Sequence, residues 1–168
     1  MAEGPAGHPT GASADDRRRL HQAIELSRRC PPSATAFSVG AVIVDAGGAT
    51  LATGWSREHD PRDHAEEAAL AKLGVAGGAG GAADPVRLAG ATLYSSLEPC
   101  SRRASRPRTC SQLILAAGVP RVVFAWREPE LFVDCHGAED LRAAGVEVVE
   151  VPDLAELVRQ VNAHLLGG

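Results

Sequence analysis

The sequence lacks a long apolar run, a basic stripe and a secretory signal. No stretch approaches the roughly 18 consecutive apolar residues of a membrane-spanning helix, so we expect no membrane association. Aromatic residues make up 4% of the chain and the formal net charge is −4. This balance does not suit the basic, aromatic-lined groove that binds nucleic acid polymers, so we expect no such partner. The first residues have no charged-then-apolar pattern, and we expect a cytoplasmic protein.

Cysteine is also scarce, with four residues in 168. In a reducing compartment these side chains are thiols or metal ligands. The length suits one domain, which at this size buries roughly 70% of the unfolded surface without a disulfide scaffold. We expect residues 1–12, rich in Gly, Pro and Ala, to form a disordered tail and residues 13–168 to form a single domain. The cysteines are Cys30, Cys100, Cys110 and Cys135.

Alternating helix and strand patterns predict an α/β fold. Ser13 is a typical N-cap for a first helix, which ends before Pro31. Two β-branched runs flank a glycine-containing turn and are expected to pair as an antiparallel hairpin. The predicted elements are a helix from 13 to about 30, strands 39–44 and 50–55, helix 63–73, a flexible loop at 74–83, strand 91–97, helix 110–117, strand 122–126, helix 136–144, strand 146–151 and helix 152–166. This order predicts three layers, α/β/α, with a mixed five-stranded sheet and right-handed crossovers.

A histidine, a glutamate and two cysteines predict an open metal site. His64 lies at the start of a helix, and Glu66 follows two positions later. Cys100 follows a predicted strand, and Cys110 begins the next helix. One imidazole and two thiolates can hold zinc and leave a fourth position for water, whose proton Glu66 could accept and pass to a leaving amine. The pattern therefore predicts hydrolytic deamination, with Glu66 catalytic and the other three residues as zinc ligands.

Other interpretations of the same residues stay open. Asp63 with Glu66 three positions later also fits a helix capping box. A structural zinc site would need a fourth protein ligand, for which His59, Cys135 and His136 are candidates. A non-catalytic, zinc-stabilised interaction module is then the competing class of protein.

At these residues the chain resembles the cytidine/deoxycytidylate deaminase superfamily, and within it the riboflavin-pathway deaminases of diaminopyrimidines. In that group a long insertion also separates the two cysteines. The similar segments are 53–58 (TGWSRE), 64–70 (HAEEAAL), 96–103 (SLEPCSRR), 127–133 (REPELFV) and 141–148 (LRAAGVEV). The resemblance implies a cytidine deaminase-like fold, a zinc cofactor, Glu66 as proton shuttle and a homodimer or homotetramer.

The resemblance also implies a small-molecule substrate, a diaminopyrimidinone with a phosphorylated sugar or sugar alcohol. Arginines near the metal ligands would suit the phosphate, because a guanidinium binds phosphate oxygens in a fork. Phe37 lies in a run similar to one in cytidine deaminases, where it would wall the pocket, and Trp126 could stack on the ring. Both are also candidate core residues. The expected phosphate-binding residues are Arg102, Arg103 and Arg106, with Arg108 beside them.

A free base or nucleoside, such as cytosine, guanine or cytidine, is the alternative substrate. The cluster of arginines distinguishes the two classes, since an unphosphorylated substrate has no need of it. An enzyme that edits polynucleotides fits the acidic charge balance less well.

Overall fold

The computed structural model describes residues 11–75, 88–102, 107–129 and 135–166. The expected N-terminal tail, apart from its last two residues, and most of the loop at 74–83 lie outside these ranges. Within them, no helix is long and apolar enough to cross a membrane. The helices and strands are α1 (Ala14–Ser27), β1 (Gly40–Val44), β2 (Thr50–Trp55), α2 (Ala65–Ala71), β3 (Thr92–Leu97), α4 (Cys110–Ala117), β4 (Arg121–Trp126), α5 (Gly137–Ala143), β5 (Glu147–Glu150), α6 (Ala155–Val161) and the 3-10 helices η1 (Pro152–Leu154) and η2 (Ala163–Leu165).

Five strands form one mixed sheet in the order β2-β1-β3-β4-β5. The hairpin partners β1 and β2 are antiparallel, and β1 pairs antiparallel with β3 on its other side. The pairs β3–β4 and β4–β5 are parallel. The predicted mixed sheet with an opening hairpin is therefore confirmed.

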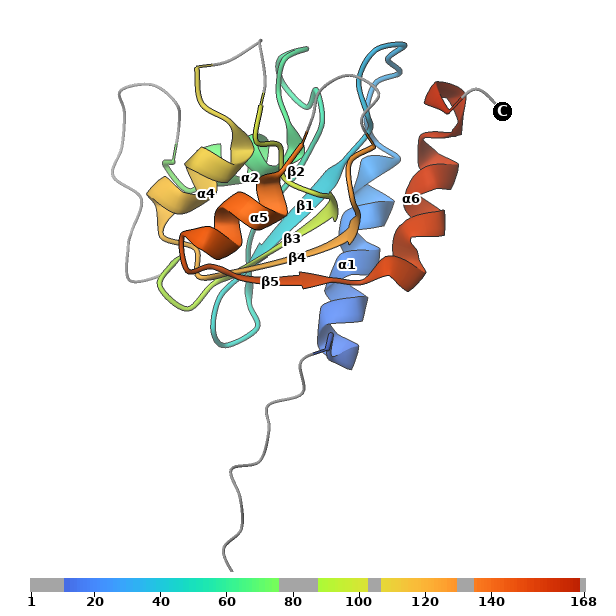
Figure 1. Ribbon diagram of the computed structural model, residues 1–168. Coiled ribbons are helices and arrows are strands. Elements are labelled where there is room, and N and C mark those ends of the chain that lie inside the picture. The colour runs from blue at the N-terminus through green and yellow to red at the C-terminus, as the bar shows by residue number, and fades with distance from the viewer. Residues whose placement is uncertain (1–10, 76–87, 103–106, 130–134, 167–168) are drawn as a thin grey trace, which may run out of the picture.

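Helices cover both faces of the sheet, as expected. Figure 1 shows α2, α4 and α5 on one face and α1 and α6 on the other. Strand β1 is buried along its whole length, and its alternate side chains enter two separate apolar clusters. Ala41 and Ile43 belong to the cluster beneath α2, whereas Val42 and Val44 belong to the cluster beneath α1.

Two glycines allow α2 and α5 to begin in close contact with neighbouring backbone. A Cβ atom at Gly54 in β2 would lie 2.5 Å from the Ala65 carbonyl oxygen, at the start of α2. A Cβ atom at Gly137 would lie 1.8 Å from the Pro99 carbonyl oxygen, so α5 begins directly against the segment after β3. Any larger residue would push these helix starts away from the sheet edge.

Two predicted helices differ from the structure. The helix expected at 63–73 is shorter, because His64 has an extended backbone with ψ of 157° and serves as N-cap. The helix expected at 152–166 is divided into η1, α6 and η2. Its regular part ends at Val161 because the buried Asn162 amide bonds the Val158 carbonyl oxygen at 3.1 Å and the backbone of Ser38.

Candidate metal centre and active site

His64 is the N-cap of α2 and directly precedes the first residue of that helix. Its backbone N–H donates to Glu67 Oε1 at 3.4 Å. Glu67, rather than Glu66, therefore caps this helix start, which removes the structural explanation that the sequence left open for Glu66. Asp63 takes another role, because its carboxylate accepts the backbone N–H groups of residues 59 and 60.

Cys100 and Cys110 both lie next to the His64 imidazole. Thr109 caps α4 by accepting the Gln112 N–H, and Cys110 is the first residue of that helix. The Cys110 N–H donates to Cys100 Sγ at 3.2 Å. This donor belongs to the positive end of α4, which favours a thiolate at Cys100. Contact with the Cys110 thiol, together with the nearby His64, lowers the pKa of Cys100 to about 4.

The three side chains fit a tetrahedral metal ion. His64 Nδ1 lies 3.5 Å from Cys100 Sγ and 3.3 Å from Cys110 Sγ. Zinc bonds of about 2.1 Å to nitrogen and 2.3 Å to sulfur would set such atoms roughly 3.6 Å apart. All three ligand atoms lie within 4.8 Å of one another, so the trio could hold a metal ion.

The candidate fourth ligands lie elsewhere. The Cys135 thiol donates to the Pro99 carbonyl oxygen at 3.5 Å, and burial raises its pKa to about 12. His59 pairs with Glu58 at 2.7 Å, and the His136 backbone N–H donates to Ser101. Among the described residues, the cluster that could hold a metal contains only the imidazole and two thiols. The geometry therefore favours a centre with an open position.

Glu66 lies beside this cluster without belonging to it. Its side chain is 3% exposed, and the Ser95 hydroxyl donates to Glu66 Oε1 at 2.6 Å. Burial raises the pKa of this carboxyl, although the Ser95 hydroxyl and the neighbouring His64 act in the opposite direction. Burial therefore makes it easier for this carboxyl to take up a proton than for an exposed glutamate.

A cavity of about 340 Å³ opens in front of the cluster. Its wall includes His64, Glu66 and Cys100, together with Phe37 and the exposed Arg102. This volume suits a small heterocyclic ligand.

The other predicted substrate-binding residues lie away from this wall or outside the described ranges. Trp126 is not among the residues that line the cavity, and it packs edge-on against Phe37 with ring centroids 5.8 Å apart. Arg103 and Arg106 lie outside the described residues, and Arg108 is exposed.

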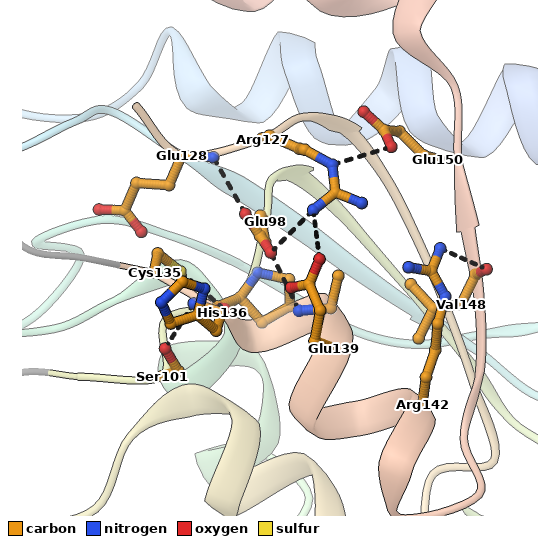
Figure 2. A network of polar contacts seen from close by, with 12 residues as sticks. Glu98, Ser101, Arg127, Glu128, Cys135, His136, Glu139, Arg142, Val148 and Glu150 are labelled. Atoms are coloured by element: carbon orange, nitrogen blue, oxygen red, sulfur yellow. Dashed lines mark hydrogen bonds and ion pairs between the residues drawn. The ribbon is translucent and has the colours of Figure 1, made fainter. Parts of the chain in front are cut away.

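The cavity is also lined by Glu98 and Glu128, which no sequence pattern predicted as site residues. The Glu98 carboxylate accepts the N–H groups of Glu128 at 3.3 Å and Ala138 at 3.0 Å (Figure 2). Arg127 Nη1 lies 3.9 Å from the same carboxylate. Glu98 thus joins the end of β3, two residues before Cys100, to the start of α5. Partial burial raises the pKa of Glu128 to about 7.

Comparison with known families identifies this class of site. Residues 13–126 match the family described as the cytidine and deoxycytidylate deaminase zinc-binding region. The chain belongs to this family, and its one imidazole and two thiols form a cluster that could hold a metal ion.

Individual relatives come from riboflavin metabolism. The chain is 39% identical over 130 residues to the diaminohydroxyphosphoribosylamino-pyrimidine deaminase of Schizosaccharomyces pombe, covering 77% of this chain and 30% of the relative. It is 35% identical over 151 residues to the riboflavin biosynthesis protein RibD of Aquifex aeolicus, covering 88% and 37%. The chain therefore spans about a third of the length of these curated relatives.

Solved structures confirm the cytidine deaminase-like fold. RibD of Acinetobacter baumannii, form 1, has a TM-score of 0.67 and 29% identity, covering 89% of this chain and 38% of that chain. The Rib2 deaminase of Aspergillus oryzae in complex with DARIPP has a TM-score of 0.71 and 22% identity, covering 88% and 90%.

Proposed function

We propose that the protein is a zinc-dependent hydrolytic deaminase of an amino-substituted pyrimidine, and that its substrate is a phosphorylated diaminopyrimidinone of riboflavin-type metabolism. The observation that carries the reaction class is the position of Glu66. This buried carboxyl lines the cavity beside three potential zinc ligands and is not one of them.

In this proposal His64, Cys100 and Cys110 hold the zinc ion, and Glu66 moves the protons. When bound, zinc supplies a water nucleophile that is active at neutral pH. Glu66 accepts a proton from the attacking water on its carboxylate and passes it to a ring nitrogen. It then takes the remaining proton from the hydroxyl added to the ring carbon and delivers it to the departing amine, so that the C–N bond breaks as the carbonyl forms. Water and the ring amine are thereby converted to a ring carbonyl and ammonia. The contact between the Ser95 hydroxyl and Glu66 Oε1 orients this carboxyl group.

The residues that line the cavity suit a substrate with a planar ring and an anionic substituent. Phe37 offers an apolar surface to the ring, and Trp126 supports Phe37 from behind. Arg102, exposed at the cavity, can bind a phosphate, and we assign the same role to Arg103 and Arg106.

The relatives support the choice of substrate. The Schizosaccharomyces pombe relative is named as a deaminase of a diaminohydroxyphosphoribosylamino-pyrimidine.

We further propose a homodimer or homotetramer in the cytoplasm. No disulfide joins the four cysteines, all of which lie among the described residues, and this fits a reducing compartment.

Ammonia release from a substrate panel tests the proposal. The zinc-loaded protein is assayed with the phosphorylated diaminopyrimidinone, its dephosphorylated form, cytosine, guanine and cytidine. We expect turnover of the phosphorylated compound, with kcat/KM at least about tenfold above that of the dephosphorylated form. Faster turnover of a free base or nucleoside would favour the alternative substrate class. Bound zinc without ammonia release from any compound would favour a non-catalytic module.

A further inference from the structure

We propose that Arg57 is a positioning residue. It holds the part of the cavity wall that contains Phe37 at the distance that the substrate ring requires. The inference rests on the proposed function for its kinetic consequence. Its structural part concerns the segment 31–38, which connects α1 to β1, and stands independently of the substrate.

The Arg57 guanidinium is spread over this segment. Its Nε and Nη2 groups both donate to the Pro31 carbonyl oxygen, at 3.0 and 2.7 Å. Nη1 donates to the Phe37 carbonyl oxygen at 3.2 Å, and Nη2 also donates to Ser38 Oγ at 3.1 Å. One side chain therefore fixes both ends of the segment.

The Arg57 backbone connects this wall to the metal centre. Its N–H donates to the Asp63 carbonyl oxygen at 2.8 Å, one residue before His64. Arg57, Asp63, Phe37 and His64 all line the cavity. The hydrogen bonds of Arg57 thus set the spacing between the aromatic wall and the residue that begins the zinc cluster.

The backbone conformation of Arg57 indicates that its side chain is needed. Its φ is 60°, and it is the only residue other than glycine with a positive φ in the described part of the chain. Glycine would adopt this conformation without strain, whereas arginine does not. Strained residues of this kind cluster at binding sites, where surrounding contacts compensate for the strain.

The acceptors of Arg57 are all uncharged. They are two carbonyl oxygens and one hydroxyl, and the described residues include no carboxylate paired with this guanidinium. The contribution of Arg57 therefore depends on the planar fork of donors, which lysine cannot reproduce, rather than on its charge.

Hydrogen exchange tests the structural part on the zinc-loaded protein without substrate. The variants Arg57→Ala, Arg57→Gly and Arg57→Lys are compared with Arg28→Ala, which removes an exposed arginine paired with Glu25 in α1. We expect exchange in the peptide 33–39 to rise at least about tenfold in the three Arg57 variants and to stay unchanged in the control. Arg57→Gly should melt at a higher temperature than Arg57→Ala, because glycine removes the strain.

Kinetics test the consequence for the substrate. We expect KM for the phosphorylated diaminopyrimidinone to rise about tenfold in each Arg57 variant, while kcat stays within about threefold and zinc content is unchanged. This division follows because Phe37 lines the cavity in which the proposed function places the ring and is not one of the potential metal ligands. A rise in KM with Arg57→Ala that Arg57→Lys fully reverses would overturn the proposal in favour of simple charge attraction.

The exchange result separates this inference from the proposed function. Unchanged exchange at 33–39 in Arg57→Gly would overturn the positioning role whatever the substrate is. If the wild-type protein releases no ammonia from the panel, the proposed function fails, and increased exchange in the variants still supports the structural role of Arg57.

Discussion

A buried carboxyl group lies on each face of the sheet, and β3 directs a hydroxyl to both. Tyr94 and Ser95 are neighbours on this strand, so their side chains point to opposite faces. The Tyr94 hydroxyl donates to Asp16 Oδ1 at 2.8 Å, and the Ser95 hydroxyl donates to Glu66 Oε1 at 2.6 Å. Asp16 and Glu66 are 5% and 3% exposed, so the two sites are almost equally buried.

The two carboxyl groups differ in the charged side chains that surround them. Arg121 donates two hydrogen bonds of 2.8 Å to Asp16, which hold the pKa of that carboxyl well below its usual range. Within the described ranges Glu66 has no ion pair, and burial raises its pKa. The Arg121 guanidinium therefore holds Asp16 as an anion that fastens α1 to β4, whereas burial favours the protonated form of Glu66. Burial alone therefore does not set the pKa of a carboxyl group, because the paired guanidinium outweighs its effect at Asp16.

Substitution of Glu66 should have the largest effect on activity. We expect Glu66→Gln to retain its zinc and its unfolding midpoint, because the amide is uncharged and nearly the same size, and to lose about 10³-fold in kcat. Metal analysis, chemical denaturation and an ammonia assay measure the three quantities. Substantial residual turnover would show that another group moves the proton.

Substitution of Asp16 should have the converse result. Asp16→Asn leaves Arg121 without its anion, so we expect the free energy of unfolding to fall by roughly 2–4 kcal/mol. The folded fraction should retain the wild-type kcat and zinc content, because Asp16 lies on the opposite face from the metal centre. Urea denaturation combined with activity per folded molecule checks both statements.

Acidification provides the control for this variant. The folded-state pKa of Asp16 is below the unfolded-state value of about 3.8, so its contribution is complete above that value and is lost as the pH falls below it. The difference in unfolding free energy between wild type and Asp16→Asn should therefore be constant from pH 7 to 5 and shrink below pH 4. A difference that grows with acid would contradict this ion-pair account.

Local patterns predicted most of the fold. The start of α1 follows from Ser13 and Asp16, whose reciprocal hydrogen bonds span only three positions. The end of α6 could not be predicted in this way, because the Asn162 side chain that competes with the helix bonds Ser38, 124 positions earlier. Contacts at that separation leave no periodic signal in the sequence.

The same division applies to the candidate site. The potential metal ligands could be predicted because cysteine and histidine are rare and chemically distinctive. Arg57, Glu98 and Glu128 could not, since their side chains are common surface types whose surroundings arise only in the fold. The capping role also went to Glu67 instead of Glu66, a shift of one residue that helix propensity cannot resolve.

Removal of each hydroxyl on β3 tests the comparison between Asp16 and Glu66 with the smallest expected effects. Tyr94→Phe should lower the free energy of unfolding by about 1 kcal/mol and leave kcat unchanged, because Asp16 retains Arg121. Ser95→Ala should lower kcat about tenfold with less change in stability, because Glu66 loses the hydroxyl that orients its carboxyl group. If Ser95→Ala instead lowers stability alone, as Tyr94→Phe is expected to do, then Ser95 contributes only to packing on its face. The orientation of the Glu66 carboxyl must in that case come from the metal centre and the bound substrate.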